Sequence, residues 1–219
     1  MHHPDTMNKF VLIGLLLFSI KAVSQTTTSE AVAIGDSILK SKIGDRLFQY
    51  FSLSEGSYYT YYDKHLRQEM GKFLSKKKLP ESFTTLNFLY HFNYPEIKGV
   101  KGGLWLIVDK DFKLTDTLNF DYIPQFLIKD KSSDFIPVDS VLKIAKKNFK
   151  QTGSLYSAST PELTYSEKLH QYIYTVYNEL SLTSTEKNPR KEKEFIEINA
   201  ITGKVENIGK GWFGGIIIR

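Results

Sequence analysis

The side chains that most often carry out catalysis are few and far apart in this chain. Its 219 residues include no cysteine and five histidines, so a cysteine nucleophile, a thiolate metal site and a disulfide are excluded. Beyond residue 24 the histidines are His65, His91 and His170, and none belongs to a His-Glu-x-x-His metal motif. No Gly-x-Ser-x-Gly nucleophile turn and no phosphate-binding glycine loop is present. The sequence therefore argues against nucleophilic and metal-dependent catalysis.

Two pairs of closely spaced carboxylates could act as general acid and base: Asp109 with Asp111, and Glu192 with Glu194. Such catalysis needs carboxyl groups held in different environments that separate their affinities for protons. Each pair falls in a segment that we predict to be a turn or an exposed loop, where no pocket is implied. We therefore expect no catalytic residue, no cofactor and no metal, and we predict that the protein is not an enzyme.

A cluster of tyrosines is the first candidate for binding. Tyr58, Tyr59, Tyr61 and Tyr62 lie within five consecutive residues. In a strand, neighbouring side chains point to opposite faces, so one face would join the core while the other presents rings to solvent. Such rings could stack on a sugar or hold a peptide. The alternative is that helices and loops cover both faces.

A basic segment is the second candidate. Residues 185–193 are polar and contain Pro189, which predicts a projecting hairpin loop with Lys187, Arg190 and Lys191 as candidate partner contacts. Over the whole chain, 29 Lys and Arg residues are interspersed with 24 Asp and Glu residues, for a net charge of +5. This modest, mixed charge does not predict nucleic-acid binding.

The N-terminus has the pattern of a secretory signal peptide. Lys9 precedes an uncharged apolar run from Phe10 to Ile20, and the small residues Ala22 and Ser24 follow. As a helix this run would be about 16 Å long, roughly half of the hydrocarbon core of a bilayer. We expect residues 1–24 to be removed, which leaves a soluble periplasmic or extracellular protein with no membrane span. Because no cysteine is available, we expect no lipid anchor.

Apolar spacing predicts helices and strands in the first half of the remaining chain. A helix is predicted over Ala31–Phe51, and a second one from His65 to Leu74, where Leu66, Met70 and Phe73 fall at helical spacing. The segment Leu86–Tyr94 alternates between aromatic or aliphatic and other residues, which is typical of a strand with one buried face. Leu104–Val108 is predicted to be a buried strand.

The second half has one strongly amphipathic helix, predicted over Val138–Phe149. Strands are predicted at Leu163–Tyr165, Gln171–Tyr177 and Phe195–Asn199, the last two antiparallel. A turn follows in which the Asn199 side chain accepts a backbone hydrogen bond, Thr202 lies within the turn, and Gly203 adopts a positive φ. This motif is structural and carries no reactive group.

The second half resembles the PepSY domain family. The likeness covers residues 135–208 and rests on the order of helix, strands and charged segment, followed by Asn199-Ala-Ile-Thr-Gly-Lys-Val205. PepSY domains often have Asp where this chain has Asn199. The resemblance implies a cystatin-like fold, with one helix on an antiparallel sheet. It also implies a role in restraining a peptidase or assisting the assembly of another envelope protein.

The first half repeats this order of elements. A helical region, the strand Leu86–Tyr94, a glycine-containing loop and a strand ending at Asp109-Lys-Asp-Phe-Lys-Leu114 correspond to the second half in pattern. We therefore predict an α+β protein of two tandem PepSY-like units, residues 25–130 and 131–219. The alternative is a single sheet to which both halves contribute strands.

These features predict an exported, non-catalytic PepSY-like binding or inhibitory module that acts on a peptidase or another envelope or secreted protein. The alternative is a protein that binds a glycan or another small ligand through the exposed tyrosines.

Cleavage of the leader gives the first prediction. Because Ala22 and Ser24 are the small residues that a signal peptidase accepts next to its cleavage site, N-terminal sequencing of the exported protein should begin at Gln25. A protein recovered with Met1 or Met7 at its N-terminus would contradict this assignment.

Overall fold

The protein was analysed as a computed structural model that describes residues 26–75, 78–150, 159–185 and 188–213. For residues 181–185, 188–191 and 212–213 it describes the backbone only. In chain order the elements are α2 (Thr28–Ile43), α3 (Asp45–Phe48), β1 (Phe51–Leu53), β2 (Tyr58–Asp63), β3 (Gln68–Phe73), β4 (Phe83–Asn93), β5 (Lys101–Asp109), α4 (Gln125–Ile128), α5 (Val138–Asn148), β6 (Glu162–Ser166), β7 (Gln171–Thr185), β8 (Asn188–Asn199) and β9 (Val205–Phe213).

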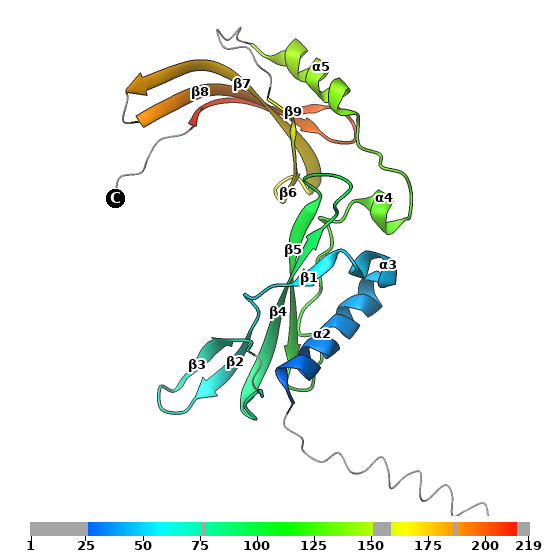
Figure 1. Cartoon of the computed structure of the whole chain (residues 1–219), viewed down its shortest axis with the longest axis vertical. Helices are drawn as coiled ribbons and strands as arrows, with labels where there is room; N and C mark the ends of the chain where they lie inside the picture. Colours follow the sequence, from blue (N-terminus) through cyan, green and yellow to red (C-terminus); the bar gives the residue numbers. More distant parts are fainter. Residues whose placement is uncertain (1–25, 76–77, 151–158, 186–187, 214–219) are drawn as a thin grey trace, which may run out of the picture.

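The strands form two antiparallel sheets, one in each half of the chain (Figure 1). In the N-terminal sheet β1 and β2 pair with the same edge of β4, β3 pairs with β2, and β5 pairs with the other edge of β4. The C-terminal sheet is a meander in the order β6-β7-β8-β9. The α+β class predicted from the sequence is confirmed, with separate sheets in the two halves.

The first helix is fixed at both ends by its sequence. Thr27 and Glu30 form a capping box, and Thr27 also forms a β-bridge with Lys78. At the other end Gly44 has a φ of 77°, which separates α2 from the short α3. The single helix predicted over Ala31–Phe51 is therefore divided at this glycine.

The core of the N-terminal half lies between α2 and β4. Leu86, Phe88, Tyr90 and Phe92 are all buried, as their alternation in the sequence predicted. The Tyr90 hydroxyl donates to Asp36 at 2.7 Å, which ties the middle of α2 to the strand. Helix and strand pack closely at Gly35, because a Cβ there would lie 3.0 Å from the Tyr90 hydroxyl oxygen and 3.1 Å from the Phe88 ring.

The C-terminal half packs α5 on its sheet through Val141 and Ala145. The predicted turn after β8 is confirmed. The Asn199 side-chain oxygen accepts hydrogen bonds from the backbone N–H groups of Ile201 and Thr202 at 2.9 and 2.8 Å, and Gly203 has a φ of 71°.

The helix predicted over His65–Leu74 is wrong, because these residues form the β2–β3 turn and strand β3. The Asp63 carboxylate accepts hydrogen bonds from the N–H groups of His65 and Leu66, and Arg67 adopts a φ of 52°. This turn ends β2 and starts β3. The apolar residues at helical spacing do not form one buried helix face, since Phe73 is 69% exposed.

The projecting loop predicted over residues 185–193 is also wrong in its extent. Strand β7 continues to Thr185 and β8 begins at Asn188, so most of this polar segment is paired β-structure. Pairing on both sides of β8 by β7 and β9 holds Lys191, Glu192 and Lys193 extended despite their polarity.

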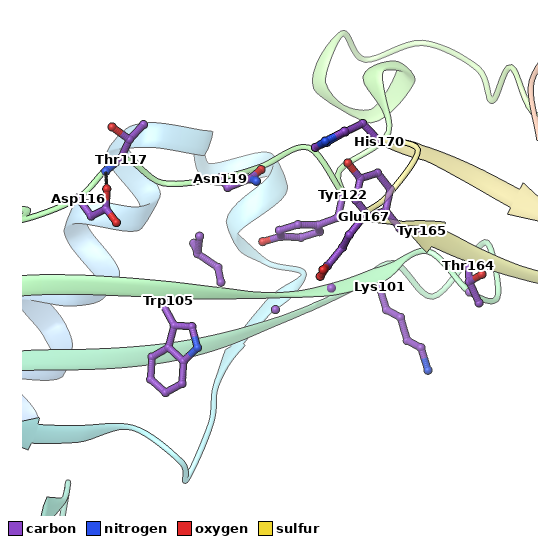
Figure 2. Close-up of a pocket in the computed structure, with 14 residues that line it drawn as sticks. Lys101, Trp105, Asp116, Thr117, Asn119, Tyr122, Thr164, Tyr165, Glu167 and His170 are labelled. Atoms are coloured by element: carbon purple, nitrogen blue, oxygen red, sulfur yellow. Dashed lines mark hydrogen bonds between the residues drawn. The ribbon is translucent and has the colours of Figure 1, made fainter. Parts of the chain in front are cut away.

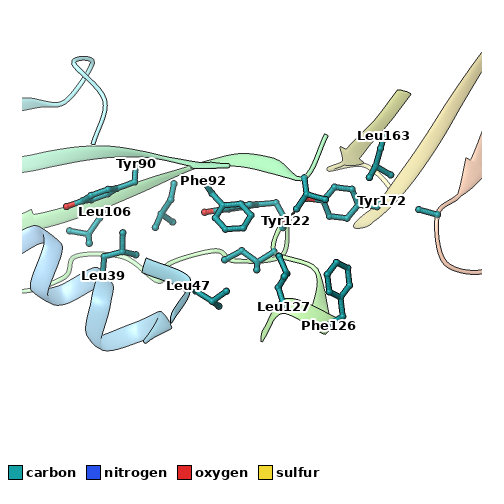
Figure 3. Close-up of a cluster of buried hydrophobic side chains, with 14 of the residues drawn as sticks. Leu39, Leu47, Tyr90, Phe92, Leu106, Tyr122, Phe126, Leu127, Leu163 and Tyr172 are labelled. Atoms are coloured by element: carbon teal, nitrogen blue, oxygen red, sulfur yellow. Dashed lines mark hydrogen bonds between the residues drawn. The ribbon is translucent and has the colours of Figure 1, made fainter. Parts of the chain in front are cut away.

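The two halves share one hydrophobic core. The connecting segment places Tyr122 between them: its ring contacts Phe92 of β4, and its carbonyl oxygen accepts a 2.6 Å hydrogen bond from the Tyr172 hydroxyl of β7 (Figure 3). Phe135 extends this contact, with its ring 5.3 Å from the Tyr172 ring and 5.3 Å from that of Phe126. The angle between the sheets is therefore set by packed side chains.

The chain traces a C in which both long helices lie on the outer side (Figure 1). The faces of the two sheets that carry no helix line the inner, concave side. Among the helices in the described ranges, none is long and apolar enough to cross a membrane.

Two adjacent glycines give a test of the junction. A Cβ at Gly102 would lie 2.3 Å from the Tyr122 ring, whereas at Gly103 the nearest neighbouring atom is 3.9 Å away. Gly102→Ala should therefore lower the free energy of unfolding by about 1–3 kcal/mol through overpacking, measured by chemical denaturation. Gly103→Ala is the matched control, and equal costs for the two substitutions would contradict this account of the junction.

Candidate functional site

A pocket of about 650 Å³ lies where the two halves meet, and we call it the elbow pocket (Figure 2). Three parts of the chain line it: the start of β5, the segment that connects the halves, and β6 with the turn that follows it. The principal side chains are Lys101 and Trp105, then Asp116, Asn119 and Tyr122, and then Tyr165, Glu167 and His170. Glycines 99, 102 and 103 also line the pocket, and they contribute no side chain beside Lys101 and Trp105.

Close packing at two glycines joins these three parts. Gly99 has a φ of 101°, and a Cβ there would lie 2.1 Å from the Leu163 carbonyl oxygen of β6. At Gly102 the Tyr122 ring occupies the position of the missing side chain. The pocket therefore lies beside one point at which backbone of the two halves is in direct contact, at Gly99 and Leu163, and beside a second at which a ring of the connecting segment covers the backbone of β5.

Trp105 links the elbow pocket to the open face of the N-terminal sheet. This residue is 46% exposed, and its ring meets the Tyr58 ring edge to face, with 5.7 Å between centroids. Strand pairing places Tyr58, Tyr62, Phe73 and Trp105 on the face opposite α2, and we call these four residues the aromatic face. Three of them are exposed large apolar side chains.

The predicted tyrosines divide between the two faces of β2. Tyr58 and Tyr62 belong to the aromatic face, whereas Tyr59 packs against the core and its ring contacts that of Tyr61 at 6.0 Å. The alternation predicted from the sequence therefore describes this strand. Sequence reasoning missed Trp105, although its place opposite Leu104 and Leu106 in an alternating strand was a usable signal.

The predicted basic contacts do not lie at the elbow pocket. Arg190 and Lys191 belong to β8 and pair with the far end of β7, away from the turn that contains His170. Lys187 lies outside the described residues. The structure thus does not bring the tyrosines and this basic segment together.

His170 is the histidine that lines the elbow pocket. His170 Nδ1 lies 3.7 Å from Asp121 Oδ2, and both side chains are largely exposed. The described part of the chain has no group of three or more His, Asp or Glu side chains able to hold a metal ion. Asp109, of the first carboxylate pair, accepts two backbone hydrogen bonds in a turn, and Glu194, of the second, accepts one from Lys150 N–H.

Two tyrosine hydroxyls in the pocket wall are buried without a hydrogen-bond partner among the described residues, those of Tyr122 and Tyr165. Burial raises the pKa of both phenols, and for Tyr165 the nearby charges of Asp121 and Glu167 raise the pKa further. Both phenols therefore stay neutral at physiological pH. A buried polar group without a partner lowers stability, so the pocket wall is not optimised for folding alone.

These hydroxyls give a stability prediction with a built-in comparison. Tyr122→Phe removes an unpartnered buried hydroxyl, so the midpoint of thermal unfolding should stay the same or rise. Tyr172→Phe removes the 2.6 Å hydrogen bond to the Tyr122 carbonyl. This substitution should lower the free energy of unfolding by about 1 kcal/mol and so lower the midpoint. If Tyr122→Phe lowers the unfolding midpoint as much as Tyr172→Phe does, the Tyr122 hydroxyl has a hydrogen-bond partner in solution.

No protein-family model matches this chain, and neither a curated protein nor a solved structure matches it. The likeness of residues 135–208 to PepSY domains is therefore a prediction from those residues alone. What the elbow pocket binds has to be inferred from its own groups.

Proposed function

We propose that this protein is an exported, non-catalytic binding module whose partner is another polypeptide of the cell envelope or the extracellular space. The observation that carries this proposal is the concave side of the molecule, which no helix of the described residues covers. Each sheet has its helix on the outer side, and the aromatic face continues through Trp105 into the elbow pocket (Figures 1 and 2).

Exposed aromatic side chains next to a pocket are typical of protein interfaces. Tyr and Trp bury much area on binding and lose little conformational freedom. Phe73, Tyr62 and Trp105 are 69%, 51% and 46% exposed. Neighbouring exposed apolar side chains of this kind are typical of an interaction site. A polypeptide partner would bury these rings and place polar groups near Lys101, Asp116 and Glu167 at the pocket rim.

The two halves fit the proposal of tandem PepSY-like units. In each, a helix precedes a central pair of strands, β4–β5 or β7–β8, flanked on one side by β2 or β6. After β5 the Asp109 carboxylate accepts from backbone N–H groups in a turn, as Asn199 does after β8. Leu114 then bridges to Val108, in the place that β9 takes beside β8. Strands β1 and β3 have no counterpart in the second unit. The likeness supports inhibition of a peptidase as one form of the proposed binding.

A second candidate function is glycan binding, and the elbow pocket favours it. Trp105 offers a ring for stacking, and Asp116, Asn119 and Glu167 offer carboxylate and amide groups for hydroxyl groups of a sugar. The two proposed functions differ in the ligand that would saturate the elbow pocket, which is a polypeptide in the first and a glycan in the second.

Two exposed side chains of equal exposure allow a controlled test. Trp105 on the concave side and Val138 at the start of α5 are both 46% exposed. The protein should be immobilised as wild type, Trp105→Ala and Val138→Ala and exposed to envelope extract, and each captured polypeptide should then be purified for direct titration. We expect Trp105→Ala to weaken direct binding about thirtyfold, as for an aromatic anchor worth about 2 kcal/mol, and Val138→Ala to leave it unchanged.

Equal affinity of all three forms would contradict binding through the concave side. A glycan panel titrated by calorimetry decides the second candidate: saturable binding that Trp105→Ala abolishes, with no polypeptide captured, would replace the first proposal by the second.

A further inference from the structure

The outer edge of β5 exposes main-chain hydrogen-bonding groups at regular spacing. In an antiparallel strand the N–H and C=O of one residue point to the same edge, and successive residues alternate between edges. Ile107 O accepts from Thr115 N, and Asp109 N donates to Lys113 O, on the edge away from β4. Val100 O accepts from Tyr94 N, on the β4 side. By this alternation Trp105, Gly103 and Lys101 direct their N–H and C=O groups outward.

Among the described residues, main-chain pairing with this edge is confined to its C-terminal end. The segment from Lys113 to Thr115 bonds to β5 at Asp109 and Ile107, and Leu114 bridges to Val108. The chain then leaves the edge and returns at Tyr122, whose ring covers Gly102. Within the part of the chain that the structure describes, no main-chain group pairs with the outer edge between Lys101 and Trp105.

The unpaired edge opens into the elbow pocket. Lys101, Gly103 and Trp105 all line that pocket, and Figure 2 shows Trp105 and Lys101 projecting from the strand beneath the connecting segment. Outward-facing residues in a strand recur about every 6.8 Å. Donors and acceptors that alternate at this spacing are complemented by another extended backbone.

We propose that the Lys101–Trp105 edge of β5 accepts an extended segment of the partner polypeptide as an added strand. This inference rests on the proposed function and specifies its mode of recognition. Gly103 lies at the centre of the edge, where the lack of a side chain leaves both of its main-chain groups accessible. Side chains on one face of the added segment meet Trp105, and those on the other face meet the Tyr122 side of the pocket.

The chemistry of these flanking walls predicts the sequence preference of the segment. The Trp105 ring, backed by Tyr58, favours an apolar or aromatic residue at the adjacent position. Lys101 lies on one side of the pocket rim, whereas Asp116 and Glu167 lie on the others, so the rim carries charges of both signs. Specificity therefore depends on alternation of apolar residues more than on net charge.

The test uses the protein expressed from its full sequence and a pool of random seven-residue peptides displayed on phage. Peptides that bind the wild type are synthesised and titrated against Gly103→Pro, which removes the outward N–H and places a ring on the edge without breaking a bond to β4. Ser132→Pro, in an exposed connecting segment, is the matched control. We expect affinity to fall at least about tenfold for Gly103→Pro, equivalent to about 1.4 kcal/mol or more, and to be retained by Ser132→Pro.

A second measurement needs no change to the protein. Methylation of alternate backbone nitrogens in a selected peptide should abolish binding in one register and spare it in the other, because only every second N–H faces β5. This comparison decides the question even where Gly103→Pro does not fold, as judged by circular dichroism.

Other outcomes overturn the inference in distinguishable ways. Equal peptide affinity for wild type and folded Gly103→Pro, or equal tolerance of methylation in both registers, rules out strand addition at β5. Capture of a polypeptide that Trp105→Ala weakens and Gly103→Pro does not would leave the proposed function standing without the added strand. A wild-type dimer that Gly103→Pro dissociates would assign the edge to a second copy of this chain instead.

Discussion

The packing of Tyr122 against the bare backbone of β5 is the contact on which the rest of the architecture depends. The Tyr122 ring occupies the space that a side chain would take at Gly102, and it contacts Phe92. The Tyr122 carbonyl oxygen accepts a hydrogen bond from the Tyr172 hydroxyl. These contacts join the connecting segment to both sheets at once. They merge the two hydrophobic cores, set the angle between the sheets and form one wall of the elbow pocket.

Local patterns in the sequence predicted local structure well. The alternation of Leu86 to Phe92 and the Asn199 turn are encoded within a few residues, and both are found as expected. The helix expected over His65–Leu74 failed because the Asp63 side chain and the αL conformation of Arg67 impose a turn, and pairing with β2 then overrides the apolar spacing. Polar composition likewise did not prevent Asn188–Lys193 from pairing within a sheet.

The candidate site could not be predicted, because its parts come from segments that only tertiary packing brings together. Lys101, Asn119 and His170 are distant in sequence and carry no shared motif. Tyr58 and Tyr62 were identified as binding candidates from their strand, but the ring that connects them to the pocket, Trp105, belongs to a segment assigned entirely to the core. The groups at the β5 edge are main-chain atoms, which no residue type reveals.

The shared core also has a thermodynamic consequence for recognition. Strand β5 is held extended by β4 along its whole length, and the connecting segment is clamped at Ile107 and at Tyr122. The main-chain groups at Gly103 and Trp105 are thus already in the conformation that another strand requires. On association, almost all of the conformational entropy that is lost belongs to the incoming segment. A flexible partner would therefore bind more weakly than one that presents the same residues in a constrained loop.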